Sequence, residues 1–140
     1  MIDVVHFEQI NRTEAYPLAL EGHVELLRQG LAEPVESVSW ENEALLAKQG
    51  SGELAGVLVF GHQKWNRSFW VQLGFVRPQF RRQGVYRAMW RQLVTIAQAR
   101  KIPVILGATS VSNTDMQRVM AQLDRSAYAI QYAYKVTDQQ

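Results

Sequence analysis

The amino-acid sequence predicts an α+β fold in which helices flank one mixed central sheet. Three apolar, strand-like runs between residues 44 and 76 follow one another through short turns, which is typical of an antiparallel meander. A helical repeat over residues 85–100 then separates the third run from another short strand, and this strand–helix–strand order predicts a parallel crossover. With 140 residues and 47% hydrophobic content, the chain is sized for one core, so we expect a single domain over residues 1–140.

The first third of the chain predicts an edge strand followed by two helices. Ile2–Phe7 is rich in β-branched and apolar residues, as strands are. After Thr13, apolar residues recur at helical spacing as far as Leu31, and Pro17 fits the first turn of a helix. We expect the helical region to break near Gly22.

The remaining elements follow from turn signals and periodicity. Residues 44–49 and 53–60 flank a glycine-containing turn, and Ser68–Val76 forms the third strand, which ends before Pro78. Residues 104–106 form a short buried strand. Asn113 is a suitable N-cap for a helix that continues to about residue 123. Residues 127–136 alternate between large apolar and small or polar side chains, which predicts a final strand.

Composition excludes several classes of protein. The 15 basic and 13 acidic residues leave a net charge of only +2, which does not favour a nucleic-acid-binding protein. The chain has no cysteine, which excludes disulfides, thiolate metal sites and a cysteine nucleophile, and its three histidines lack metal-ligand spacing, so no metal is expected. No signal peptide and no run of about 20 apolar residues is present, so we expect a cytoplasmic protein without a membrane span.

The segment from residue 76 to residue 89 carries the clearest functional signal. A strand stops at Pro78, an arginine-rich turn follows, and a helix begins at Gly84. The first N–H groups of a helix are unpaired and its dipole is positive there, so a phosphate is a natural ligand. Gly84 lets an anion approach the backbone, and Arg81, Arg82 and Arg87 can add charge-assisted hydrogen bonds. The alternative interpretation is a solvated basic turn that only caps the helix.

This segment resembles motif A of the GCN5-related N-acetyltransferase (GNAT) family, Arg/Gln-x-x-Gly-x-Gly/Ala. Arg81 and Gly84 match the motif, whereas Tyr86 stands where glycine or alanine is usual. The glycine turn after Ala47 resembles the family's hairpin, and Asn113 resembles its motif B asparagine, so motifs support the resemblance over residues 44–123. The resemblance implies acetyl-CoA as cosubstrate. It assigns CoA binding to Phe75, Val76, Arg81, Arg82, Gln83, Gly84, Val85, Tyr86, Arg87 and Asn113.

The resemblance also implies a mechanism. The strand that ends at Val76 should splay from the next parallel strand, and its backbone near Phe75 should hold the pantetheine arm and polarise the thioester carbonyl. A primary amine would then attack directly in a ternary complex. Members often have a tyrosine acid where this chain has Met120, and a thioether donates no proton.

The proton-transfer groups and the acceptor therefore stay open. The catalytic candidates are Gln72, His23 and Tyr128, with Tyr132 and Tyr134 nearby, and the candidates for acceptor binding are Glu21 and Glu25. The acceptor can be an aminoglycoside, a polyamine, an amino acid, a protein amine or a modified nucleobase. Two alternatives remain, a non-catalytic acyl-CoA-binding module of the same fold and a small protein-interaction domain. The final strand is a candidate for pairing across a homodimer.

Overall fold

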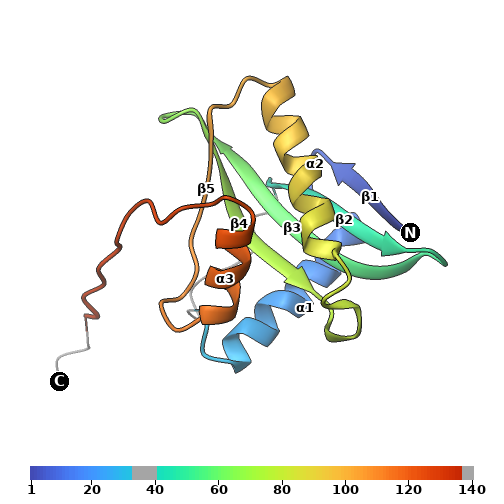
Figure 1. The fold of residues 1–140 in the computed structure, drawn as a ribbon, viewed down its shortest axis with the longest axis horizontal. Coiled ribbons are helices and arrows are strands. Elements are labelled where there is room, and N and C mark those ends of the chain that lie inside the picture. Colours follow the sequence, from blue (N-terminus) through green and yellow to red (C-terminus); the bar gives the residue numbers. More distant parts are fainter. Residues whose placement is uncertain (33–40, 137–140) are drawn as a thin grey trace.

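A five-stranded mixed sheet organises the chain, with strand order β1-β2-β3-β4-β5 (Figure 1). The computed structural model describes residues 1–32 and 41–136. Strands β1 to β4 pair antiparallel with their neighbours, and β5 runs parallel to β4, which confirms the predicted meander and crossover. The elements are β1 (Ile2–Phe7), α1 (Ala15–Arg28), β2 (Glu43–Gln49), β3 (Glu53–Gln63), β4 (Ser68–Val76), the 3₁₀ turn η1 (Pro78–Phe80), α2 (Val85–Ala99), β5 (Val104–Gly107) and α3 (Thr114–Gln122).

Helices α1 and α2 cover opposite faces of the sheet and divide the core into two layers. Leu18 and Ala19 of α1 pack with Val57 and Phe75, while Met89 of α2 packs in a separate cluster on the other face. The apolar positions of each helix repeat at helical spacing, so one stripe of each helix is buried on the sheet. No helix within residues 1–32 and 41–136 is long and apolar enough to cross a membrane.

Helix α1 is continuous from Ala15 to Arg28, so the predicted break near Gly22 is wrong. Gly22 is buried against β4, and a Cβ added at this position would lie 2.6 Å from Cγ of Phe75. The glycine therefore does not interrupt the helix. It lets the helix backbone lie directly on an aromatic side chain of the sheet.

The predicted final strand is also wrong, because residues 127–136 belong to no helix or strand. This segment leaves the body of the molecule beyond α3 (Figure 1). The side chains of Tyr128, Ile130, Tyr132, Tyr134 and Val136 are 78–91% exposed. Alternation of apolar and polar side chains shows that a segment could pack with one face on a core. A strand forms only where the edge of a neighbouring strand pairs with its backbone N–H and C=O groups.

Replacing Gly22 by alanine tests the close approach of α1 to β4. Alanine gains about 1 kcal/mol of helix propensity over glycine, whereas overpacking a core costs about 1–3 kcal/mol. We expect Gly22→Ala to lower the free energy of unfolding by about 1 kcal/mol in urea titrations. The matched control is Gly50→Ala, because a Cβ at Gly50 meets no atom within 4 Å. A Gly22→Ala protein at least as stable as the wild type would contradict this packing.

Candidate acyl-CoA site

A β-bulge at Gln72 divides β4 into two halves. On β3, Val59 lies opposite Leu73 and Phe60 lies opposite Val71, so Gln72 is the extra residue that shifts the register. Before the bulge, Phe69 and Val71 pack in the α2 layer; after it, Leu73 and Phe75 pack in the α1 layer. In a regular strand these four residues would share one face, so the extra residue reverses the orientation of the second half.

Strand β5 stays beside only the first half of β4. Their pairing joins Ser68 to Val104 and ends where Val71 meets Gly107. Beyond Val71, β4 continues as far as Val76, and β5 does not extend beside this part of it in the described chain. Pairing between the two parallel strands thus stops at the bulge, because β5 itself ends at Gly107, and β4 keeps a backbone edge that can hydrogen-bond an extended ligand.

The turn after β4 leads into α2 through two residues in the left-handed region. Arg82 has φ 64° and Gly84 has φ 81°, and α2 begins at Val85. Within the described chain, the backbone N–H groups of residues 82–87 donate to no acceptor. A Cβ added at Gly84 would meet no atom within 4 Å, so the space beside these N–H groups is open. A helix N-terminus of this form suits a phosphate group.

Arg77 holds the start of this turn and is not available to a ligand. Its Nε and Nη2 donate to the two carboxylate oxygens of Glu21, both at 3.0 Å, and its Nη1 donates to the Leu54 carbonyl at 3.2 Å. The hydrogen bonds with Glu21 raise the pKa of Arg77 above its usual value. Glu21 is therefore joined to the end of β4 by an ion pair between α1 and the turn.

The other cations of the turn surround the open N–H groups. Arg81 donates through Nε to the Val76 carbonyl at 2.9 Å, which leaves its two terminal nitrogens for other acceptors. Arg82 and Arg87 are exposed and form no ion pair with any described residue. Oε1 of Gln83 accepts a hydrogen bond from Nε2 of Gln49 at 3.0 Å, which connects the turn to the β2–β3 hairpin.

Tyr86 stands where motif A usually has glycine or alanine. Its side chain points away from the open space beside the backbone N–H groups at Gly84. Its ring lies over β4, where a Cβ at Gly74 would be 2.6 Å from Cε2 of Tyr86. Arg125 Nη1 donates to the Tyr86 hydroxyl at 3.3 Å. Burial raises the pKa of Tyr86, partly offset by Arg125. Glycine inside a strand often marks such a close approach, so Gly74 is the sequence signal for this contact, which was not among the predictions.

Asn113 acts as the N-cap of α3, as predicted. Its Oδ1 accepts from the Met116 backbone N–H at 3.1 Å. The side-chain nitrogen donates to no residue in the described chain, so it is available to another acceptor while the cap is intact.

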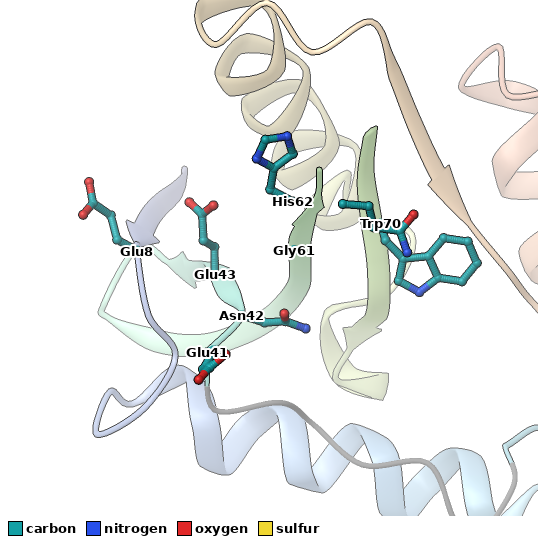
Figure 2. A pocket seen from close by; sticks show the side chains of 8 residues that line it. Glu8, Glu41, Asn42, Glu43, Gly61, His62 and Trp70 are labelled. Atoms are coloured by element: carbon teal, nitrogen blue, oxygen red, sulfur yellow. The ribbon is translucent and has the colours of Figure 1, made fainter. Parts of the chain in front are cut away.

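A pocket of about 380 Å³ lies at the end of the sheet where β2 begins and β3 ends. Figure 2 shows the carboxylates of Glu8 and Glu43 and the ring of His62 directed to the same side of these strands. The residues that line the pocket are Glu8, Glu41, Asn42, Glu43, Gly61, His62, Gln63 and Trp70. This set was not predicted from the sequence, since its members come from four separate segments without a motif.

Asn42 connects this pocket to the bulge. Its Nδ2 donates to Oε1 of Gln72 at 2.6 Å. The Asn42 amide lies over Gly61, where a Cβ would be 2.6 Å from Oδ1 of Asn42. Glycine at position 61 therefore lets Asn42 reach across β3 to Gln72. Gln72 thus connects the pocket to the point where the pairing of β4 with β5 ends.

The other candidate residues do not line the pocket. His23 is half-buried on α1, and Tyr128 lies on the exposed C-terminal segment. Glu25 accepts from Arg28 at 3.2 Å and from Gln29 at 2.9 Å on the surface of α1. Of the predicted acceptor and catalytic residues, Gln72 is hydrogen-bonded to the pocket wall, through Asn42.

Comparison with known proteins places this geometry in a family. The model of the Acetyltransferase (GNAT) family matches residues 8–124, and the chain belongs to this family. A search of curated proteins gives no match.

Solved structures of acetyltransferases share the fold. An aminoglycoside acetyltransferase, AAC(6')-Iy, solved with a CoA-containing bisubstrate analogue, has a TM-score of 0.66 at 18% identity over 99% of each chain. A ribosomal-protein-alanine N-acetyltransferase from Brucella melitensis has a TM-score of 0.67 at 18% identity, covering 99% of this chain and 100% of that one. A putative acetyl transferase from Pyrococcus furiosus has a TM-score of 0.72 at 13% identity, covering 97% and 100%.

Glu43, in the wall of the pocket, is held by two basic side chains. Arg100 donates to its carboxylate at 2.7 and 2.8 Å, and Nε2 of His6 lies 2.8 Å from Oε1. Burial by itself would raise the pKa of Glu43, but the hydrogen bonds from Arg100 and His6 outweigh burial and hold the pKa below its ordinary value.

This lowered pKa predicts a specific dependence of stability on pH. The stabilising contribution of the Glu43 carboxylate is present above its unfolded-state pKa, near 4.5, and is lost as the pH falls through the lower native pKa. We expect Glu43→Gln to lower the free energy of unfolding by about 1 kcal/mol at pH 7, and this difference should shrink on acidification. Urea unfolding between neutral and acid pH measures it, with the exposed carboxylate change Asp115→Asn as control. A difference that stays constant or grows at low pH would refute the assignment.

Proposed function

We propose that this protein is an acetyl-CoA-dependent N-acetyltransferase that acetylates a primary amine. The observation that carries the proposal is the bulge at Gln72, where the pairing of β4 with β5 ends and Gln72 accepts a hydrogen bond from Asn42 in the wall of the pocket. One reaction centre between two separate binding regions suits a direct transfer from a donor to an acceptor.

The donor would occupy the open edge of β4 and the turn before α2. The N–H groups of residues 82–87 suit the CoA pyrophosphate, with Arg81, Arg82 and Arg87 supplying positive charge. The backbone from Gln72 to Val76 suits the amides of the pantetheine arm, and the free amide nitrogen of Asn113 is a further donor. A thioester carbonyl near the bulge would be polarised by a backbone N–H of this edge.

The acceptor amine would enter from the pocket and reach the thioester beside Gln72. Its nitrogen attacks the carbonyl carbon, the N–C bond forms, the C–S bond breaks, and CoA leaves as the thiol after taking up a proton. Glu8 and Glu41 line the pocket, and their carboxylates favour a cationic acceptor, whereas the charge of Glu43 is balanced by Arg100. A carboxamide does not accept the ammonium proton at neutral pH, so Gln72 would orient the amine while water removes the proton.

Substitution of Gly84 tests the binding of the CoA pyrophosphate. A glutamate there brings a carboxylate into the open space beside the N–H groups, so we expect Gly84→Glu to abolish CoA binding in calorimetric titrations. The matched control is Gly30→Glu, since Gly30 also has a left-handed φ, 72°, and no atom within 4 Å of an added Cβ. The control carries the same charge and the same backbone strain on a different surface. Normal CoA affinity in a folded Gly84→Glu protein would refute the phosphate site.

Turnover is tested by thiol release from acetyl-CoA with a panel of primary amines. We expect the wild type to release thiol only with an amine present, and Gln72→Ala to lower kcat/KM about 100-fold through loss of positioning, at unchanged CoA affinity. Gln92→Ala, on the exposed face of α2, is the control of the same residue type. Tight CoA binding without turnover of any amine would instead favour the non-catalytic acyl-CoA-binding module.

A further inference from the structure

The phenol of Tyr86 lies beside the part of β4 that β5 does not cover. Tyr86 stands in the first turn of α2, and a Cβ added at Gly74 would lie 2.6 Å from its Cε2 and 3.3 Å from its hydroxyl oxygen. Gly74 follows Val71, where the pairing with β5 ends. The hydroxyl therefore lies against the open part of β4, along which the pantetheine arm is proposed to run.

Arg125 holds the hydroxyl from the side of β5. Its Nη1 donates to the hydroxyl oxygen of Tyr86 at 3.3 Å, and a Cβ added at Gly107, the last residue of β5, would lie 2.8 Å from its Nη2. The guanidinium carbon also lies 4.3 Å from the centre of the Trp90 ring, which fixes the guanidinium against α2. These contacts place the hydroxyl between Gly74 of β4 and the end of β5.

The Tyr86 hydroxyl carries a proton that it can donate. Arginine has no acceptor atom, so Arg125 donates to the phenol oxygen and does not take its proton. In the part of the chain that the structure describes, no other residue hydrogen-bonds this hydroxyl. Burial raises the pKa of Tyr86, and Arg125 offsets only a part of this rise, so the phenol is protonated at neutral pH.

The charge of Arg125 is available to the phenol oxygen once the proton has left. Arg125 forms no ion pair with any residue of the described chain. A cation beside a phenol oxygen stabilises the phenolate more than the neutral phenol. The backbone N–H of Arg125 donates to the Met120 carbonyl at 3.0 Å, which fixes the tyrosine–arginine pair at the end of α3. Met120 is a thioether and donates no proton, so the pair supplies a donor that this residue lacks.

The transfer proposed above requires a proton at the sulfur of CoA. In that arrangement the amine meets the thioester beside Gln72, and the pyrophosphate lies at the other end of the open edge, at the start of α2. The sulfur would therefore lie on the Gly74 side of the carbonyl carbon. Gly74 is two residues, or about 7 Å, along β4 from Gln72. A thioester and its neighbouring methylene groups span this stretch, which brings the sulfur within reach of the Tyr86 hydroxyl.

We propose that Tyr86 is the general acid that protonates the departing sulfur of CoA, and that Arg125 is the residue that positions it; this inference rests on the proposed N-acetyltransferase function. As the N–C bond forms and the C–S bond breaks, the electron pair of the C–S bond passes to sulfur, which takes the proton of the phenol. The phenolate beside Arg125 then regains a proton from water, to which the amine has released its own.

Removal of the hydroxyl alone tests this role. Phenylalanine keeps the ring over Gly74, so Tyr86→Phe should fold as the wild type does, which circular dichroism checks. With an amine that the wild type acetylates, we expect kcat to fall about 100-fold at unchanged KM for acetyl-CoA, since only the proton transfer is lost. Tyr16→Phe, which removes a phenol hydroxyl from α1, should keep the wild-type rate. A folded Tyr86→Phe protein with the kcat of the wild type would overturn the proposal.

Binding of CoA and of desulfo-CoA, which lacks the sulfur, tests the contact without turnover. Calorimetric titration should show that Tyr86→Phe binds CoA about threefold more weakly than the wild type does, because a hydrogen bond to sulfur is lost. Both proteins should bind desulfo-CoA equally. The same result with both ligands, whether a loss of affinity or none, would mean that the hydroxyl does not meet the sulfur and would overturn the proposal.

The two assays also separate this inference from the function on which it rests. A wild type that releases no thiol with any amine would refute the proposed function and the acid together. Turnover by the wild type with an undiminished rate in Tyr86→Phe would refute the acid alone.

Discussion

One extra residue in β4 controls the geometry of the proposed site. Because Gln72 is inserted into the register between β3 and β4, the second half of β4 turns its side chains to the opposite face. Pairing with β5 ends at Val71, which exposes a strand edge on one side, and the hydrogen bond from Asn42 connects Gln72 to the pocket on the other. The open edge and the connection to the pocket thus begin at the same residue, and the two proposed binding regions meet there.

Glycines fix the positions of the elements around this bulge. Gly22 brings α1 onto Phe75, Gly74 makes room for the ring of Tyr86 from α2, and Gly61 lets Asn42 reach Gln72. At each of these positions an added Cβ would lie 2.6 Å from another atom, so the spacing of helix, strand and side chain depends on its absence. The usual small residue of motif A is exchanged here for Tyr86, and Gly74 on the facing strand supplies the space instead.

The order of elements was predictable from the sequence because periodicity and turn residues act locally. The meander, the crossover and the Asn113 cap each follow from a few neighbouring residues. The bulge was not predictable, since Gln72 differs from its neighbours only through its register with β3. The break expected at Gly22 and the strand expected over residues 127–136 were wrong, because each depends on a contact with a distant part of the fold or with another edge.

The most direct test of this account follows backbone amide resonances while CoA is added to the protein. The account predicts that the largest shifts occur at residues 82–87, at the start of α2, and from Gln72 to Val76, along the open edge of β4. Resonances of α1 residues on the far surface, such as Val24, should move little. Shifts confined to another surface, or no shifts at a saturating concentration of CoA, would contradict the claim that the bulge and the helix N-terminus form one acyl-CoA site.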